Sequence, residues 1–145
     1  MIRSEYTFDN CPYKVRYGMI PSKQIENKLE RPEEEIESRF EFYEKLEKSI
    51  TDGFRNPISV TAKNGELFCK MHGGSRLYIA QKLNIDIPCL IADFNNIYSD
   101  FETINSFEEL YSKFKDRFRF MKLRYLGVFI DSLKWSLDDR FTISP

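Results

Sequence analysis

The sequence contains few of the residues that build metal centres. Its 145 residues include one histidine, His72, and three cysteines, and no two of these cysteines are spaced as Cys-x-x-Cys. A structural zinc site needs a full set of such ligands, so we expect no metal site built from protein side chains. The odd count of Cys11, Cys69 and Cys89 favours reduced, partly buried thiols in a cytoplasmic protein.

Long apolar runs and an excess of charge of one sign are also missing. No run approaches the roughly 20 residues of a membrane span, and the start, MIRSEYTFDN, lacks the apolar stretch of a secretory signal. The 22 Lys and Arg residues nearly balance the 23 Asp and Glu residues, so the net charge is −1. We therefore expect no membrane partner, and any nucleic-acid contact would need a local basic patch.

The composition is that of a globular domain with one core. Hydrophobic residues make up 41% of the chain and aromatic residues 15%, including 13 Phe and 8 Tyr. A chain of this length matches one ordinary domain. Since no internal repeat or low-complexity stretch divides it, we expect one domain with a C-terminal extension.

The first half of the chain predicts a strand, a helix and a hairpin. Residues 12–20 alternate apolar and polar side chains, which favours a short strand. After a charged linker, apolar residues recur at helical spacing over 36–50, and Gly53 is expected just beyond the end of this helix. Asn64-Gly65 separates two alternating segments, which is the strongest short signal for a β-hairpin.

The second half predicts helices and one further strand. Ser106 and Glu109 have the spacing of a capping box, which marks the start of a helix. We expect helices over about 76–84 and 107–116 and from about 123, and a buried strand over 85–94. Residues 117–122 could be either helix or strand.

A polar loop, HGGSR at 72–76, lies between an apolar strand and an apolar helix and is the clearest candidate site. Gly73 and Gly74 can adopt positive φ and let an anion approach backbone N–H groups at the helix N-terminus. Ser75 can cap the helix or donate to a phosphate oxygen, Arg76 offers a planar fork that fits phosphate, and His72 can hold or transfer a proton. The loop matches neither the P-loop nor the dinucleotide fingerprint. Two interpretations therefore stay open, an anion site and a purely structural turn.

The surroundings of this loop resemble the N-terminal domain of ParB-like proteins. In that family, a helix ending in Ser-Ile leads through a Gly to an x-Pro-Ile-x-Val strand. A hairpin strand then ends in Gly-x-x-Arg, which opens a helix that carries an Ala. The matching residues here are Ser49, Ile50, Gly53, Asn56–Val60, Gly73, Arg76, Ala80 and, in the strand that follows, Pro88. The resemblance covers 46–94 well and 12–45 loosely, and it does not extend to the C-terminal part.

The resemblance implies an α+β fold of the ParB/sulfiredoxin superfamily, with a small mixed β-sheet and packed helices. We expect this domain over 1–98 and a mainly helical extension over 99–145 packed on it. The superfamily includes CTP-hydrolysing segregation clamps, sulfiredoxins, free serine kinases and proteins labelled as nucleases, and it places nucleotide phosphates on this loop. Gly73 and Arg76 match the phosphate-holding part, whereas the reactive Glu, Cys or paired His of those relatives is missing.

The leading hypothesis is therefore a nucleotide-phosphate-binding protein, either an NTP hydrolase or a phosphotransferase such as a kinase, with ATP or CTP and Mg²⁺ as ligands. Phosphoryl transfer needs positioning, a metal and often one carboxylate base. Relatives supply an acidic residue in the region of Glu34, Glu35 and Glu37, and a basic residue in the first strand, here Arg16, could face the phosphates. A solvated helix face and an ordinary strand charge are the alternatives. The candidate catalytic residues are His72, Ser75 and Glu35, and the candidate phosphate-binding residues are Gly73, Gly74, Ser75, Arg76 and Arg16.

A basic segment near the C-terminus supports a second hypothesis. Its cations interleave with phenylalanines, a pattern that fits single-stranded nucleic acid, so a nucleic-acid-binding or nuclease module is the alternative function. The candidate contact residues are Lys115, Arg117, Arg119 and Lys122. An amphipathic element with its Phe side chains in the core explains the same pattern without a ligand. A non-catalytic interaction module is the third hypothesis, and apolar residues after 125 could pack against a second copy as a homodimer.

Overall fold

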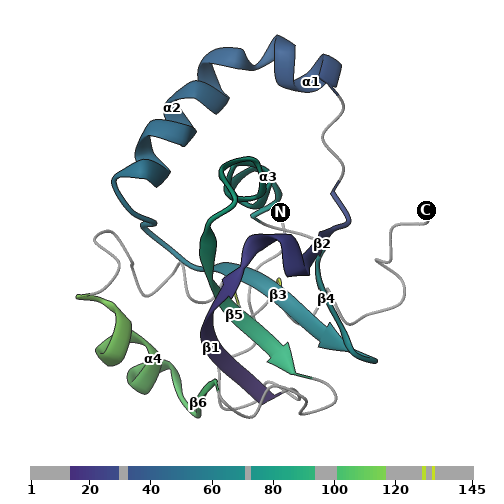
Figure 1. Ribbon diagram of the computed structural model, residues 1–145. Helices are drawn as coiled ribbons and strands as arrows, with labels where there is room; N and C mark the ends of the chain where they lie inside the picture. Colours follow the sequence, from purple (N-terminus) through teal and green to yellow (C-terminus); the bar gives the residue numbers. More distant parts are fainter. Residues whose placement is uncertain are drawn as a thin grey trace.

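The computed structural model describes residues 14–29, 33–70, 73–93 and 101–116, together with Phe129 and Ser132. Within these residues, strands and helices alternate around one sheet (Figure 1), which confirms the expected α+β class. The elements are β1 (Lys14–Pro21), a 3-10 turn η2 (Ser22–Gln24), β2 (Ile25–Asn27), α1 (Glu33–Ser38), α2 (Phe40–Thr51), β3 (Ile58–Lys63), β4 (Glu66–Cys69), α3 (Gly74–Leu83), β5 (Asp86–Asp93), β6 (Glu102–Ile104) and α4 (Phe107–Phe114).

The strands of the described residues form a six-stranded mixed sheet in the order β2-β4-β3-β5-β1-β6. The pairs β1–β5, β1–β6 and β3–β4 are antiparallel, whereas β2–β4 and β3–β5 are parallel. A parallel pair needs a crossover connection, which β4 and α3 supply between β3 and β5. This crossover brings the turn that opens α3 back to Ile58, the first residue of β3.

Local sequence signals are found where they were expected. Asn64 and Gly65 have φ of +52° and +81°, the positive values that a two-residue hairpin turn requires, and they join β3 to β4. Gly53, with φ of +119°, follows the last residues of α2. At the start of α4, the Ser106 hydroxyl accepts a bond of 3.1 Å from the Glu109 backbone N–H. The predicted hairpin, helix end and helix start are confirmed.

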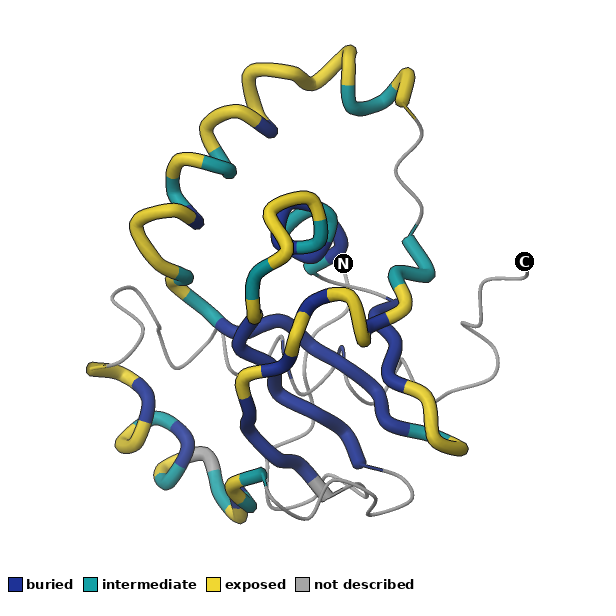
Figure 2. The backbone as a smooth tube through the Cα atoms, viewed as in Figure 1, coloured by how far each residue is buried: buried dark blue, intermediate teal, exposed yellow. Residues whose placement is uncertain are grey.

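The main core lies between α3 and one face of the sheet. Leu77 and Ala80 of α3 are fully buried against aliphatic side chains of alternate strand positions, as the two-residue period of a strand requires. Figure 2 shows these central strands buried along most of their length. On the opposite face, the Phe114 ring of α4 packs on Tyr17 of β1 with a centroid distance of 4.2 Å. Both faces of the sheet are therefore covered.

Helices α1 and α2 form one bent helical arm that arches beyond α3 (Figure 1). The backbone leaves the helical region at Arg39, with φ of −117° and ψ of 32°. Backbone hydrogen bonds still cross the bend, from Arg39 N–H to the Glu35 carbonyl and from Tyr43 N–H to the Arg39 carbonyl. The predicted helix over 36–50 is confirmed, and the bend is an addition that the apolar spacing did not predict.

Two short strands were not predicted. Strand β2 lies in the stretch expected to be a charged linker, and β6 lies in the stretch expected to be mainly helical. Each has three residues, too few for an alternating pattern to stand out. The predicted helix from about 123, the open segment 117–122 and His72 lie outside the described residues. Among the described residues, no helix has the length and apolar character to cross a membrane.

Candidate functional site

Gly73 forms the turn between β4 and α3 and has a conformation that only glycine adopts easily. Its φ is +100°, in the left-handed region, and its carbonyl accepts the Leu77 N–H at 2.8 Å to open α3. A Cβ atom at this position would lie 2.6 Å from Ile58 Cγ2, which is closer than real carbon atoms approach. The glycine is thus required by both backbone angle and packing, whatever the turn binds.

Arg76 connects the same turn to the segment that precedes β3. Its Nη1 donates to the Asn56 carbonyl oxygen at 2.7 Å and to the Pro57 carbonyl oxygen at 3.4 Å. The other terminal nitrogen, Nη2, lies beside the Gly73 backbone, 3.6 Å from the place that a Cβ would take. Arg76 therefore holds two chain segments together, and its positive charge lies next to the turn.

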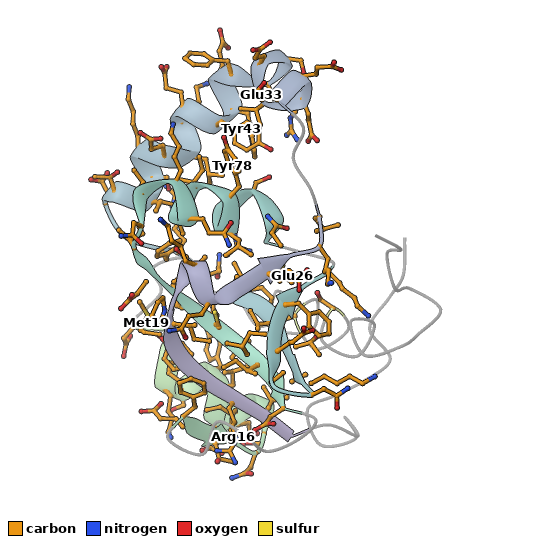
Figure 3. The ribbon with its side chains drawn as sticks, turned by 45° about the vertical axis from the view of Figure 1, so that its right-hand side comes forward. Arg16, Met19, Glu26, Glu33, Tyr43 and Tyr78 are labelled. Carbon is orange, nitrogen blue, oxygen red and sulfur yellow. The ribbon has the colours of Figure 1, made fainter. Side chains whose placement is uncertain are left out.

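Ser75, in the first turn of α3, faces a tyrosine from the helical arm. The Ser75 Oγ lies 3.5 Å from the Tyr43 hydroxyl, and either group could donate. The Tyr43 ring also meets Tyr78 edge to face at 5.7 Å between centroids (Figure 3). Tyr43 is only 4% exposed. The sequence marked Tyr43 only as one of the apolar positions of its helix, and its hydroxyl at the loop went unpredicted.

Two asparagines complete the surroundings of the turn. The Asn27 side chain, at the end of β2, donates from Nδ2 to the Gly74 carbonyl at 3.1 Å and accepts the Leu29 N–H at 3.0 Å. Within the described part of the chain, the buried Oδ1 of Asn56 has no hydrogen-bond partner. Both residues reach the turn only because segments distant in the sequence pack together, so no local pattern could have identified their roles. This side-chain acceptor belongs to the residue whose backbone carbonyl binds Arg76.

Arg16 lies elsewhere on the sheet. It is 4% exposed, and its Nε donates to Asp93 Oδ2 at 3.0 Å, while Nη1 donates to the Phe101 carbonyl and to the Thr103 hydroxyl, each at 3.2 Å. Figure 3 shows Arg16 at one end of β1, with α3 and Tyr43 beyond the other end. The structure thus joins Arg16 to β5 and β6 and does not bring it to the turn that opens α3.

The remaining candidates are spread over the molecule. Glu35, in α1, forms an ion pair of 3.7 Å with Arg39 of the same arm. Lys115, at the end of α4, lies over the Tyr111 ring at 5.7 Å. Figure 1 shows α1 and α4 at opposite ends of the molecule, so Glu35 and Lys115 do not share a site. Candidates outside the described residues are His72, Arg117, Arg119 and Lys122.

Two buried thiols, Cys69 and Cys89, lie beneath the turn. Cys89 pairs with Ile58 across β5 and β3, and both Cys69 and Cys89 are free and buried. Burial raises the pKa of the Cys89 thiol well above its ordinary value, the nearby Cys69 thiol raises it further, and Arg76 lowers it. Because the thiolate is the nucleophilic form, Cys89 supplies no nucleophile at this site at neutral pH.

Comparison with known proteins adds a structural likeness. The chain is similar to the crystal structure of sulfiredoxin from Arabidopsis thaliana, with a TM-score of 0.42 and 24% sequence identity over 53% of this chain and 84% of that chain. No family model and no curated protein matches the sequence.

Proposed function

We propose that this protein binds the phosphate groups of a nucleotide at the start of α3. The observation that carries the proposal is the meeting of three features at one turn. Gly73 leaves no side chain over the backbone, α3 begins directly after it, and Ser75 and Tyr43 bring two hydroxyl groups within 3.5 Å of each other. A helix N-terminus attracts anions through its backbone N–H groups and its dipole, and hydroxyl groups add donors to phosphate oxygens.

Each neighbouring residue has a defined part in this proposal. Arg76 keeps the turn against the Asn56 carbonyl and adds positive charge beside the phosphate. Asn27 fixes the first residue of α3 through the Gly74 carbonyl, which leaves that peptide in one orientation. The Oδ1 of Asn56, which has no partner among the described residues, would accept a donor of the ligand. The resemblance of the sequence to the ParB/sulfiredoxin superfamily, which places phosphates on this loop, supports the same site.

Turnover of the nucleotide is the further part of the proposal. Magnesium is commonly held by the phosphates together with one or two carboxylates, so Mg²⁺ would arrive with ATP or CTP. His72 and Ser75, which flank the glycines in sequence, are the groups that could move a proton during hydrolysis or phosphoryl transfer. Glu35 is the proposed carboxylate, and reaching the turn would require the helical arm to approach α3.

Calorimetry and thermal-shift measurements test nucleotide binding. Titration with ATP, CTP and ADP, each with and without Mg²⁺, and with inorganic phosphate should give binding heat and a raised melting temperature. Ser75→Ala should weaken binding about tenfold, since a hydrogen bond to a charged oxygen is lost. Tyr43→Phe should show a smaller loss. Tyr78→Phe is the matched control, because it removes a hydroxyl from a ring that packs edge to face on Tyr43.

The outcomes separate binding from catalysis. Absence of heat and of thermal shift with every nucleotide would refute the proposal. Phosphate release that depends on Mg²⁺ would support an enzyme, provided that His72→Ala abolishes the release and still binds the nucleotide. Nucleotide binding without turnover would instead support the non-catalytic interaction module.

A further inference from the structure

The tip of the helical arm is exposed on every side. All six residues from Glu37 to Phe42 are exposed, although they are helical on both sides of the bend. Two of them are large and apolar, with Phe40 exposed by 60% and Phe42 by 41%. A helix that packs on its own domain buries one face. In α1 no residue is fully buried, and Ile36 is the partly buried side chain that packs against the cluster of Tyr43, Ile50 and Ile79. Exposed aromatic side chains gathered on one projecting element indicate an interaction surface.

The charge of the arm limits what this surface can bind. Residues 33–44 contain six glutamates and one basic residue, Arg39. The Arg39 guanidinium lies over the Phe42 ring at 4.1 Å and pairs with Glu35, so its charge is engaged within the arm. An acidic and aromatic surface repels nucleic acid and attracts a basic polypeptide that carries apolar side chains.

The chain itself contains a segment with this complementary chemistry. Residues 113–124, KFKDRFRFMKLR, carry six basic residues, one aspartate and three phenylalanines. Lys113 and Lys115, at the end of α4, are exposed, and the segment from 117 on lies outside the described residues. Figure 1 shows α4 and the arm on opposite sides of α3 and the sheet. Helix α4 and the arm of one molecule therefore lie apart.

We propose that the helical arm of one copy of this protein binds the basic segment 113–124 of a second copy. Glutamates of the arm pair with Lys and Arg of the segment, and Phe40 and Phe42 contact the apolar stems of these basic side chains. Aromatic residues and Arg are both enriched in protein interfaces. Because two different surfaces meet, the contact is heterologous and adds copies head to tail. The inference is independent of nucleotide binding at the start of α3.

Sedimentation velocity across a range of concentrations tests this contact. At low salt the protein should form larger species as its concentration rises, and high salt should dissociate them, because screening weakens contacts between exposed charges. The double variant Phe40→Ser/Phe42→Ser should weaken association about tenfold or more, as expected for central aromatic contacts. The hairpin variant Glu66→Lys is the matched control, since Glu66 is exposed but belongs to β4.

A charge swap makes the test specific. The arm variant Glu34→Lys/Glu37→Lys/Glu41→Lys and the segment variant Lys113→Glu/Lys115→Glu/Arg117→Glu/Arg119→Glu should each lose self-association. Mixing the two variants should restore it, because each altered surface then has a complementary partner. Equal melting temperatures of the three proteins would show that the exposed changes leave the fold intact.

Two results would overturn the proposal. One is a wild-type protein that stays monomeric at every concentration at low salt. The proposal fails equally if this monomer binds single-stranded oligonucleotides through its basic segment. The other is self-association that neither the phenylalanine variant nor the charge reversals change.

Discussion

The core around α3 and the bend of the helical arm differ in how deeply they bury their apolar side chains. In α3, Leu77 and Ala80 are completely buried against the sheet, and the turn before them is too tight for any side chain at Gly73. In the arm, Phe40 and Phe42 are exposed, and Tyr43 and Ile50 are the buried side chains that cluster with Ile79 of α3. The apolar side chains of α3 are thus held by the fold itself, whereas the bend of the arm presents two phenylalanine rings to solvent.

The largest expected difference between the two regions is in the free energy of unfolding. Leu77→Ala should destabilise the protein by about 2–5 kcal/mol, because it leaves a cavity in a fully buried site. Phe40→Ala should change stability by no more than about 0.5 kcal/mol, since its ring is already largely in water. Urea denaturation followed by circular dichroism measures both. Equal losses for the two variants would mean that the arm is part of the core.

Gly73→Ala tests how tight the turn at α3 is. The substitution adds the strain of a positive φ, about 1–2 kcal/mol, to overpacking against Ile58, which costs about 1–3 kcal/mol. The hairpin variant Gly65→Ala is the matched control, because its φ is +81° but nothing lies within 4 Å of the added carbon. Denaturation should show a larger loss for Gly73→Ala. Similar losses would show that backbone strain alone explains the glycine.

Cys89 reports on burial beneath the turn through the pH dependence of stability. Burial raises the pKa of this thiol in the folded state. The protonated thiol therefore contributes its full share to the free energy of unfolding below the unfolded pKa of about 8.5. Stability should then fall as the pH rises further, by up to about 1.4 kcal/mol per pH unit, until the folded pKa is reached. Cys89→Ala should remove this part of the slope. An unchanged slope between pH 8 and 10 would contradict the assignment.

The smallest expected effect concerns the tie between arm and α3. Lys82 Nζ lies 3.1 Å from Glu47 Oε1, and both groups are substantially exposed. Glu47→Gln should cost less than about 0.5 kcal/mol, because water and salt screen exposed ion pairs. Tyr43→Phe, which removes the hydroxyl next to Ser75, should cost more in a thermal melt. The reverse order would show that charge, and not the Tyr43 contact, holds the arm.

Local patterns predicted much of the fold and only part of the candidate site. The hairpin at Asn64-Gly65 and the cap at Ser106 depend on neighbouring residues, so the sequence was sufficient to locate them. The turn at Gly73 was identified from its two glycines and its place between strand and helix. The three-residue strands β2 and β6 were missed because each forms by pairing with a strand that is remote in sequence.

The sequence by itself determined the order of the main helices and strands, the glycine turn and the opposite charges of the arm and the segment 113–124. Tertiary structure decided the partners. In the folded chain, Arg76 donates to the Asn56 carbonyl, Arg16 donates to Asp93, and the Tyr43 hydroxyl lies within hydrogen-bond distance of Ser75. The physical reason is range: backbone angles and apolar spacing are set by near neighbours, whereas these contacts join residues 20 to 77 positions apart. Only the tertiary arrangement of strands and helices brings such residues together.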